Sequence, residues 1–105
     1  MIDRLEKAQG YAKEIVAMLN ERLKDDENFD SVWYTWYGWD TIEFSASIKQ
    51  VKYYKYLTVN IKFDDLEDVE KIVNDMVEDW NRRTTPESID SFMGFVDFGE
   101  KYGWN

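Results

Sequence analysis

Carboxylates are the side chains in this sequence that could do the most chemistry, and they gather in its last two-fifths. Residues 64–100 contain twelve Asp and Glu residues, opposed only by Lys71, Arg82 and Arg83. The remaining acids and bases cancel, so this segment carries the whole formal charge of −9. Because a surface of one sign attracts ligands of the other, the segment predicts a positively charged partner.

Two catalytic or metal-binding uses of carboxylates come first: pairs that hydrolyse glycosidic bonds, and clusters that bind Ca²⁺ or Mg²⁺. No motif selects one such pair, and the acidic run 25–30 lacks the central glycine of an EF-hand loop. The chain has no histidine and no cysteine, which removes the commonest general base and most zinc sites. It also has no glycine-rich phosphate loop and no nucleophile elbow. We therefore expect no catalytic residue, no metal site and no cofactor.

The remaining use of the carboxylates is binding. Acids at i, i+3 and i+4 on a helix lie roughly 5–6 Å apart, so they can imitate a row of phosphates. Lys and Arg side chains that grip phosphate also grip carboxylate, Arg in bidentate fashion. The alternative is a solvated surface that keeps a small protein soluble. On the first interpretation, the partner-binding carboxylates are Asp68, Asp75, Glu78, Asp79, Glu87 and Asp90.

The aromatic run at residues 31–38 is a second candidate for binding. Side chains alternate across a strand, so this run places large rings on both faces of a sheet. Aromatic residues are enriched at interface hot spots, and we expect Trp33, Tyr37 and Trp39, which point the same way, to help bind a partner. The alternative is that these rings cover the open face of the sheet. Stacking on nucleic-acid bases is disfavoured because the nearby positive charge is sparse.

The elements that position these side chains follow from the periodicity of the apolar residues. Steps of three and four predict helices, and alternation gives each later strand one apolar and one polar face, which indicates antiparallel pairing. We expect a single α+β domain over residues 1–105, with a three-stranded antiparallel sheet, an N-terminal helix and two C-terminal helices (α-β-β-β-α-α). The predicted ranges are helix 2–24, strands 31–38, 41–49 and 54–63, and helices 65–82 and 86–98.

Local residues refine the helix boundaries. Asp64 and Asp65 are expected to cap the second helix, whereas the run from Thr84 to Glu87 with Pro86 is typical of the start of the third. Gly10 interrupts the first helix at a cost of up to about 1 kcal/mol relative to alanine. We interpret it as a close approach of this helix to the sheet.

The run Val69-Glu70-Lys71-Ile72, followed by Trp80-Asn81, resembles the second helix of one group of small phage-encoded anti-CRISPR proteins. These proteins inhibit the RNA-guided DNA nuclease of type II systems. The resemblance implies an α-β-β-β-α-α fold and an inhibitor that mimics DNA where the nuclease reads its PAM duplex with arginines. The chain differs from that family in having Arg82-Arg83 after the Trp-Asn pair, and Lys49, Lys52 and Lys55 around the second hairpin. The PAM-reading groove is therefore not specified as the target.

Our functional prediction is an anti-defence, anti-CRISPR-like inhibitor that binds the basic groove of a host nuclease through an acidic, DNA-mimicking surface. The alternatives are an immunity protein or antitoxin that neutralises a basic toxin, and a protein-interaction domain with another partner. Direct contact with nucleic acid or an anionic membrane is disfavoured because both repel an acidic protein. The charged N-terminus is unlike a signal peptide, and the expected location is the cytoplasm of a bacterial host.

Overall fold

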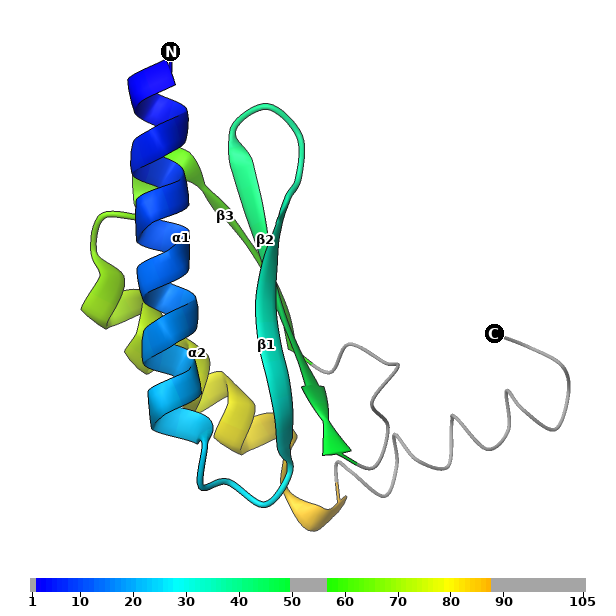
Figure 1. The fold of residues 1–105 in the computed structure, drawn as a ribbon. Coiled ribbons are helices and arrows are strands. Elements are labelled where there is room, and N and C mark those ends of the chain that lie inside the picture. The colour runs from blue at the N-terminus through cyan, green and yellow to red at the C-terminus, as the bar shows by residue number, and fades with distance from the viewer. Residues whose placement is uncertain (1, 50–56, 88–105) are drawn as a thin grey trace, which may run out of the picture.

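The computed structural model describes residues 2–49 and 57–87, which form an α+β fold with a three-stranded antiparallel sheet, as predicted (Figure 1). Most of the expected third helix, and the start of the strand expected at 54–63, lie outside the described residues. The described elements are helix α1 (Ile2–Leu23), strands β1 (Phe29–Trp36), β2 (Thr41–Ile48) and β3 (Leu57–Lys62), the 3-10 turn η2 (Phe63–Asp65) and helix α2 (Val69–Arg83).

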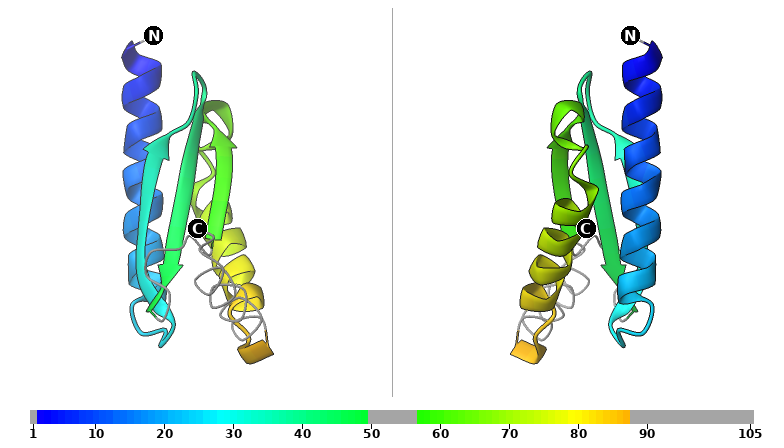
Figure 2. Two further views of the ribbon diagram at one scale, coloured as in Figure 1. Left: turned by 90° about the vertical axis from the view of Figure 1, so that its right-hand side faces the viewer. Right: turned by 90° about the vertical axis from the view of Figure 1, so that its left-hand side faces the viewer.

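The sheet has the order β1-β2-β3, with both pairs of neighbouring strands antiparallel. Phe44 of β2 stands opposite Tyr34 and Val59, and Ile42 stands opposite Trp36. Residues directly opposite one another project to the same face of a sheet, so these side chains share the core face. Both helices lie on that face, α1 against β1 and α2 beside β3 (Figures 1 and 2).

The core forms where the apolar stripes of the two helices meet this face, because the periods of 3.6 and 2 each leave one continuous apolar side. Burial of each Leu, Ile or Phe side chain contributes about 1.5–3 kcal/mol. The largest fully buried apolar side chains are Ile15, Leu19, Ile42, Phe44, Ile48, Leu57, Leu66, Val73 and Trp80.

Trp80 is the largest buried side chain among the described residues, and it connects the end of α2 to the turn that follows α1. Its ring meets Phe29 edge-on, with 5.8 Å between centroids and 79° between planes. The indole Nε1 donates to Asp26 Oδ2 at 3.3 Å, and Asp26 Oδ1 accepts from the backbone N–H of Asn28 at 2.8 Å. This fixes the acidic turn between α1 and β1 locally.

The start of α2 differs from the prediction, which placed the caps at Asp64 and Asp65. Phe63 and Leu66 are both buried, and the three residues from Phe63 form a 3-10 turn whose Leu66 N–H donates to Phe63 O at 3.3 Å. The α-helix therefore begins later, and its N-cap is Asp68, whose Oδ1 accepts from the Lys71 N–H at 3.4 Å.

Two further expectations about the sheet and α1 are wrong. Gly10 is exposed, and a Cβ added there would meet nothing within 4 Å, so it does not mark a close approach to the sheet. Ser45 and Ser47 belong to the face predicted to be polar and wet, yet both are buried. Ser47 satisfies its hydroxyl by donating to Asp30 Oδ2 at 3.1 Å, and it also lies 3.2 Å from the hydroxyl of Ser31.

Neither α-helix in the described part of the chain carries an apolar stretch long enough to cross a membrane.

Candidate partner interface

Two of the carboxylates predicted to bind a partner along α2, Asp75 and Asp79, pair with bases of the same helix. Asp75 pairs with Lys71 at 3.6 Å, four residues away. Asp79 contacts Arg82 and also Arg83, whose Nε lies 3.1 Å from Asp79 Oδ2. The side chain of Asp79 is only 15% exposed. Such pairs at i, i+3 and i+4 stabilise a helix slightly, but they also cancel most of its outward charge.

The predicted acids of α2 lie along one side of the helix. With about 100° of rotation per residue, Asp68, Asp75 and Asp79 lie within about 40° of one another, and Glu78 lies about 60° from Asp75 and about 100° from Asp79 around the axis. Asp75 and Asp79 border a groove of about 190 Å³ between α2 and β3, whose apolar lining includes Ile61. The remaining predicted acids are Glu87, which is exposed, and Asp90, which lies outside the described residues.

In the part of the chain that the structure describes, the exposed aromatic side chains gather at the turn between β1 and β2. Trp39 is 96% exposed, Tyr37 56% and Trp36 47%. Trp33 does not join them, because it lies in the middle of β1 opposite Ser45, where it is partly buried. The structure thus brings together two of the three predicted aromatic residues and adds Trp36.

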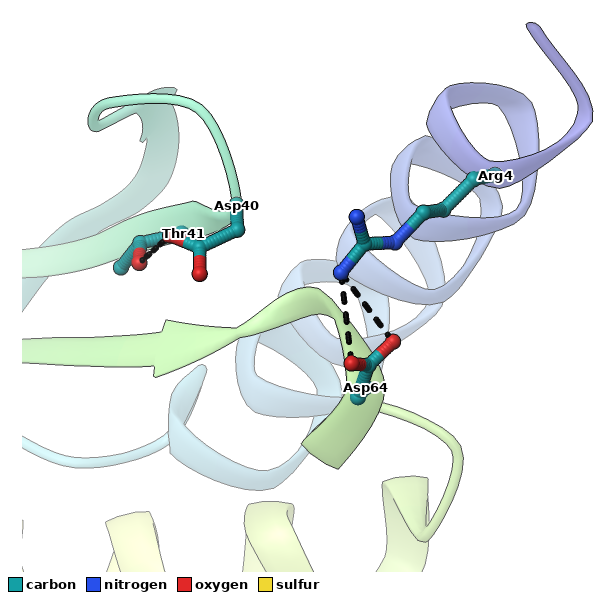
Figure 3. A network of polar contacts seen from close by, with 4 residues as sticks. All are labelled: Arg4, Asp40, Thr41 and Asp64. Atoms are coloured by element: carbon teal, nitrogen blue, oxygen red, sulfur yellow. Dashed lines mark hydrogen bonds and ion pairs between the residues drawn. The ribbon is translucent and has the colours of Figure 1, made fainter. Parts of the chain in front are cut away.

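The turn that carries these rings is held by backbone hydrogen bonds. Gly38 has φ +79°, a conformation that residues with a Cβ rarely adopt. The Tyr37 N–H donates to Thr41 O at 2.9 Å across the turn, and the Phe63 N–H donates to Asp40 O at 2.7 Å from the end of β3. The hydroxyl of Thr41 donates to Asp40 Oδ1 at 3.0 Å (Figure 3).

A chain of contacts links this turn to the acidic segment before α2. The rings of Trp36 and Phe63 meet edge-on, with centroids 5.6 Å apart. The guanidinium carbon of Arg4 lies 5.5 Å from the centroid of Phe63, and its Nη2 contacts both carboxylate oxygens of Asp64 at 3.2 and 3.3 Å (Figure 3). Asp64 and Glu67, together with Arg4 and Lys7, also line a depression of about 160 Å³ between α1 and η2.

These residues define one surface, which we call the aromatic–acidic end. Its members are Trp36, Tyr37, Trp39, Asp40, Asp64, Asp65 and Glu67. Within residues 63–68 there are four acids and no base, so here the carboxylates outnumber the cations that could cancel them. Arg4 forms an ion pair with Asp64 only, and the two side chains of this pair are half or more exposed. Among the described residues, exposed acids and exposed rings therefore lie beside one another at this end, away from the paired acids of α2.

Sequence reasoning missed Trp36, Phe63 and Arg4 as members or neighbours of this surface. The register of Trp36 with Ile42 places it on the core face, but it is the last residue of β1, and nearly half of its surface is exposed. The contact of Arg4 with Asp64 joins residues 60 positions apart, so no local sequence pattern predicts it. Within the described residues, no group of three or more ligating side chains could hold a metal ion.

Comparison of the chain with protein-family models, with curated protein sequences and with solved structures gave no match. Three of the six positions that carry the anti-CRISPR resemblance are internal: Val69 and Trp80 are buried, and Ile72 is partly buried, whereas the other three are exposed. The internal positions bear on how α2 packs. Among the described residues, the largest exposed side chains lie at the aromatic–acidic end.

Proposed function

We propose that this protein is an inhibitor that works by binding another protein, docking its aromatic–acidic end on the basic groove of a host nucleic-acid-binding nuclease. The observation that carries the proposal is the set of three exposed rings on a hydrogen-bonded turn, immediately beside an acidic segment without internal bases. Large rings exposed to water on an acidic protein contribute little to folding, and aromatic anchors within a polar surround are typical of binding hot spots.

Charge and rings have separate tasks in this proposal. The acids of residues 64–67 and the net charge of −9 raise the association rate with a basic surface and exclude acidic ones. The rings at the turn supply most of the affinity, because they bury apolar area once the partner covers them. The internal pairing of Asp75 and Asp79 moves the electrostatic weight of the surface from the middle of α2 to the segment before it.

The nuclease class rests on the resemblance to anti-CRISPR proteins and on the chemistry of the groove. A groove that holds nucleic acid presents Lys and Arg to phosphates, and carboxylates satisfy the same donors. A type II CRISPR effector in the cytoplasm of a bacterial host is therefore the first candidate, with occupation of its DNA path as the mode of inhibition.

The test is an inhibition assay with a panel of guide-loaded type II effector nucleases, scoring both DNA binding and DNA cleavage. We expect at least one nuclease to lose DNA binding when the protein is added before the DNA. Unchanged binding and cleavage across the panel would remove the proposal.

Matched charge variants locate the surface. Asp65→Asn with Glu67→Gln removes two exposed charges from the aromatic–acidic end, and Asp25→Asn with Glu27→Gln removes two exposed charges from the turn after α1. We expect the first pair to slow association several-fold and the second to have a much smaller effect, since charges near the contact dominate steering. Equal effects would show that only net charge matters and that the surface is placed wrongly.

A further inference from the structure

We propose that the aromatic–acidic end binds an arginine side chain of its partner, with the indole of Trp39 as the stacking surface and the carboxylate of Asp40 as the ion-pair partner. This inference rests on the proposed function for the nature of the partner, a basic protein. It adds the chemical group that the exposed turn recognises.

The protein already contains one such arginine site, filled by its own side chain. Phe63 and Asp64 are consecutive, and together they hold Arg4: the ring lies under the guanidinium at 5.5 Å, and the carboxylate accepts from Nη2 at 3.2 and 3.3 Å. A ring and an adjacent carboxylate are the two groups that a guanidinium uses best, one through cation–π attraction and the other through charge-assisted hydrogen bonds.

The same pair of groups recurs at Trp39 and Asp40, joined to the first by the 2.7 Å hydrogen bond from the Phe63 N–H to Asp40 O. Here the ring is 96% exposed, and Thr41 engages Oδ1 of Asp40. Among the described residues, no base forms an ion pair with Asp40. The second pair thus has the same order of ring and acid along the chain as the first, with a better cation–π ring, tryptophan in place of phenylalanine, and this ring is open to a partner.

Arginine fits this site better than lysine. The planar guanidinium stacks on an aromatic face and still presents its edge donors to a carboxylate, whereas an ammonium is a compact and strongly hydrated charge. A second copy of the chain is disfavoured as the occupant, because it would bring another net charge of −9 to the contact. The occupant is therefore an arginine on an exposed loop or groove wall of a basic protein.

The experiment is an NMR titration of the ¹⁵N-labelled protein with hexa-arginine and, separately, with hexa-lysine of the same charge. We expect the indole N–H of Trp39 and the backbone N–H groups of Gly38 and Asp40 to shift saturably, with hexa-arginine binding several-fold more tightly than hexa-lysine. Trp39→Ala should weaken hexa-arginine binding by about tenfold. Asp40→Asn, which keeps an acceptor for Thr41, should weaken it by a smaller factor.

The control variant is Asp25→Asn with Glu27→Gln, which removes two negative charges but leaves the turn between β1 and β2 unchanged. It should retain the preference for hexa-arginine over hexa-lysine. Equal affinity for the two peptides, or shifts confined to the acidic segments while Trp39 stays unmoved, would overturn the inference. Shifts of Trp39 that depend on protein concentration without peptide would also overturn it, in favour of self-association.

The two proposals fail separately. If a nuclease is inhibited and Trp39→Ala inhibits as well as the unaltered protein, the arginine site is refuted and the proposed function stands. If hexa-arginine binds at Trp39 with the expected preference and no nuclease is inhibited, the arginine site stands and the proposed function is refuted.

Discussion

Alanine at Gly38 should destabilise the protein, and the same substitution at Gly10 should stabilise it. Both glycines have open space where a Cβ would stand, so neither change introduces a clash. The difference is in the backbone: Gly38 has φ +79°, in the left-handed region, whereas Gly10 lies within α1. An alanine forced into the left-handed region costs roughly 1–2 kcal/mol, whereas alanine in place of glycine inside a helix gains roughly 0.5–1 kcal/mol.

For a chain of this size, 1 kcal/mol moves the thermal unfolding midpoint by roughly 4 °C. Gly38→Ala should therefore lower the midpoint by about 4–8 °C, and Gly10→Ala should raise it by about 2–4 °C. The assay is thermal unfolding followed by far-UV circular dichroism, with both variants measured beside the unaltered protein. A neutral or stabilising Gly38→Ala would refute the strained turn, and a destabilising Gly10→Ala would show that this part of α1 is more closely packed than the structure indicates.

Three further predictions concern other parts of the fold. Trp80→Ala should remove about 3–5 kcal/mol by emptying the largest buried site, with Trp80→Phe milder; denaturant unfolding measures both, and a small loss for alanine would contradict the core position of this ring. Asp68→Ala should cost about 1 kcal/mol as the loss of a helix N-cap, whereas Asp65→Ala should leave the unfolding midpoint unchanged; the reverse order would return the cap to the position predicted from sequence. Arg4→Ala should change stability by less than about 1 kcal/mol because its ion pair is exposed, and by vacating Phe63 and Asp64 it should add chemical-shift changes at Asp64 on titration with hexa-arginine; their absence would count against the equivalence of the two ring–carboxylate pairs.

The sheet and the helix stripes could be predicted from sequence because each depends on a short-range period. Ile42, Phe44, Ala46 and Ile48 alternate with polar residues, and a pleated strand turns that alternation directly into two faces. The start of α2 could not be predicted in the same way. Several acids in the segment before the helix are equally good caps, and the choice among them depends on where the core accepts Phe63 and Leu66.

In the candidate interface, too, some features follow from local sequence patterns and others depend on the tertiary fold. The pairing of Asp75 with Lys71, and of Asp79 with Arg83, occurs at i, i+4 and was present in the sequence as a local pattern. The exposure of Trp36 depends on where the core ends, and the contacts of Arg4 with Asp64 and of Phe63 with Asp40 join distant segments. The sequence analysis nevertheless took Asp75 and Asp79 as partner-binding acids, and only the tertiary fold shows which acids stand beside exposed rings.

The near-complete exposure of Trp39 has a consequence for how this protein can change. A side chain that rests on nothing adds nothing to the free energy of unfolding, so its identity is not constrained by the need to fold. The backbone around it is constrained, through Gly38 and through the bonds of Asp40 and Thr41. The backbone of this turn is therefore fixed, whereas the side chain at position 39 is free to vary. A single substitution at position 39 can change binding specificity without loss of stability.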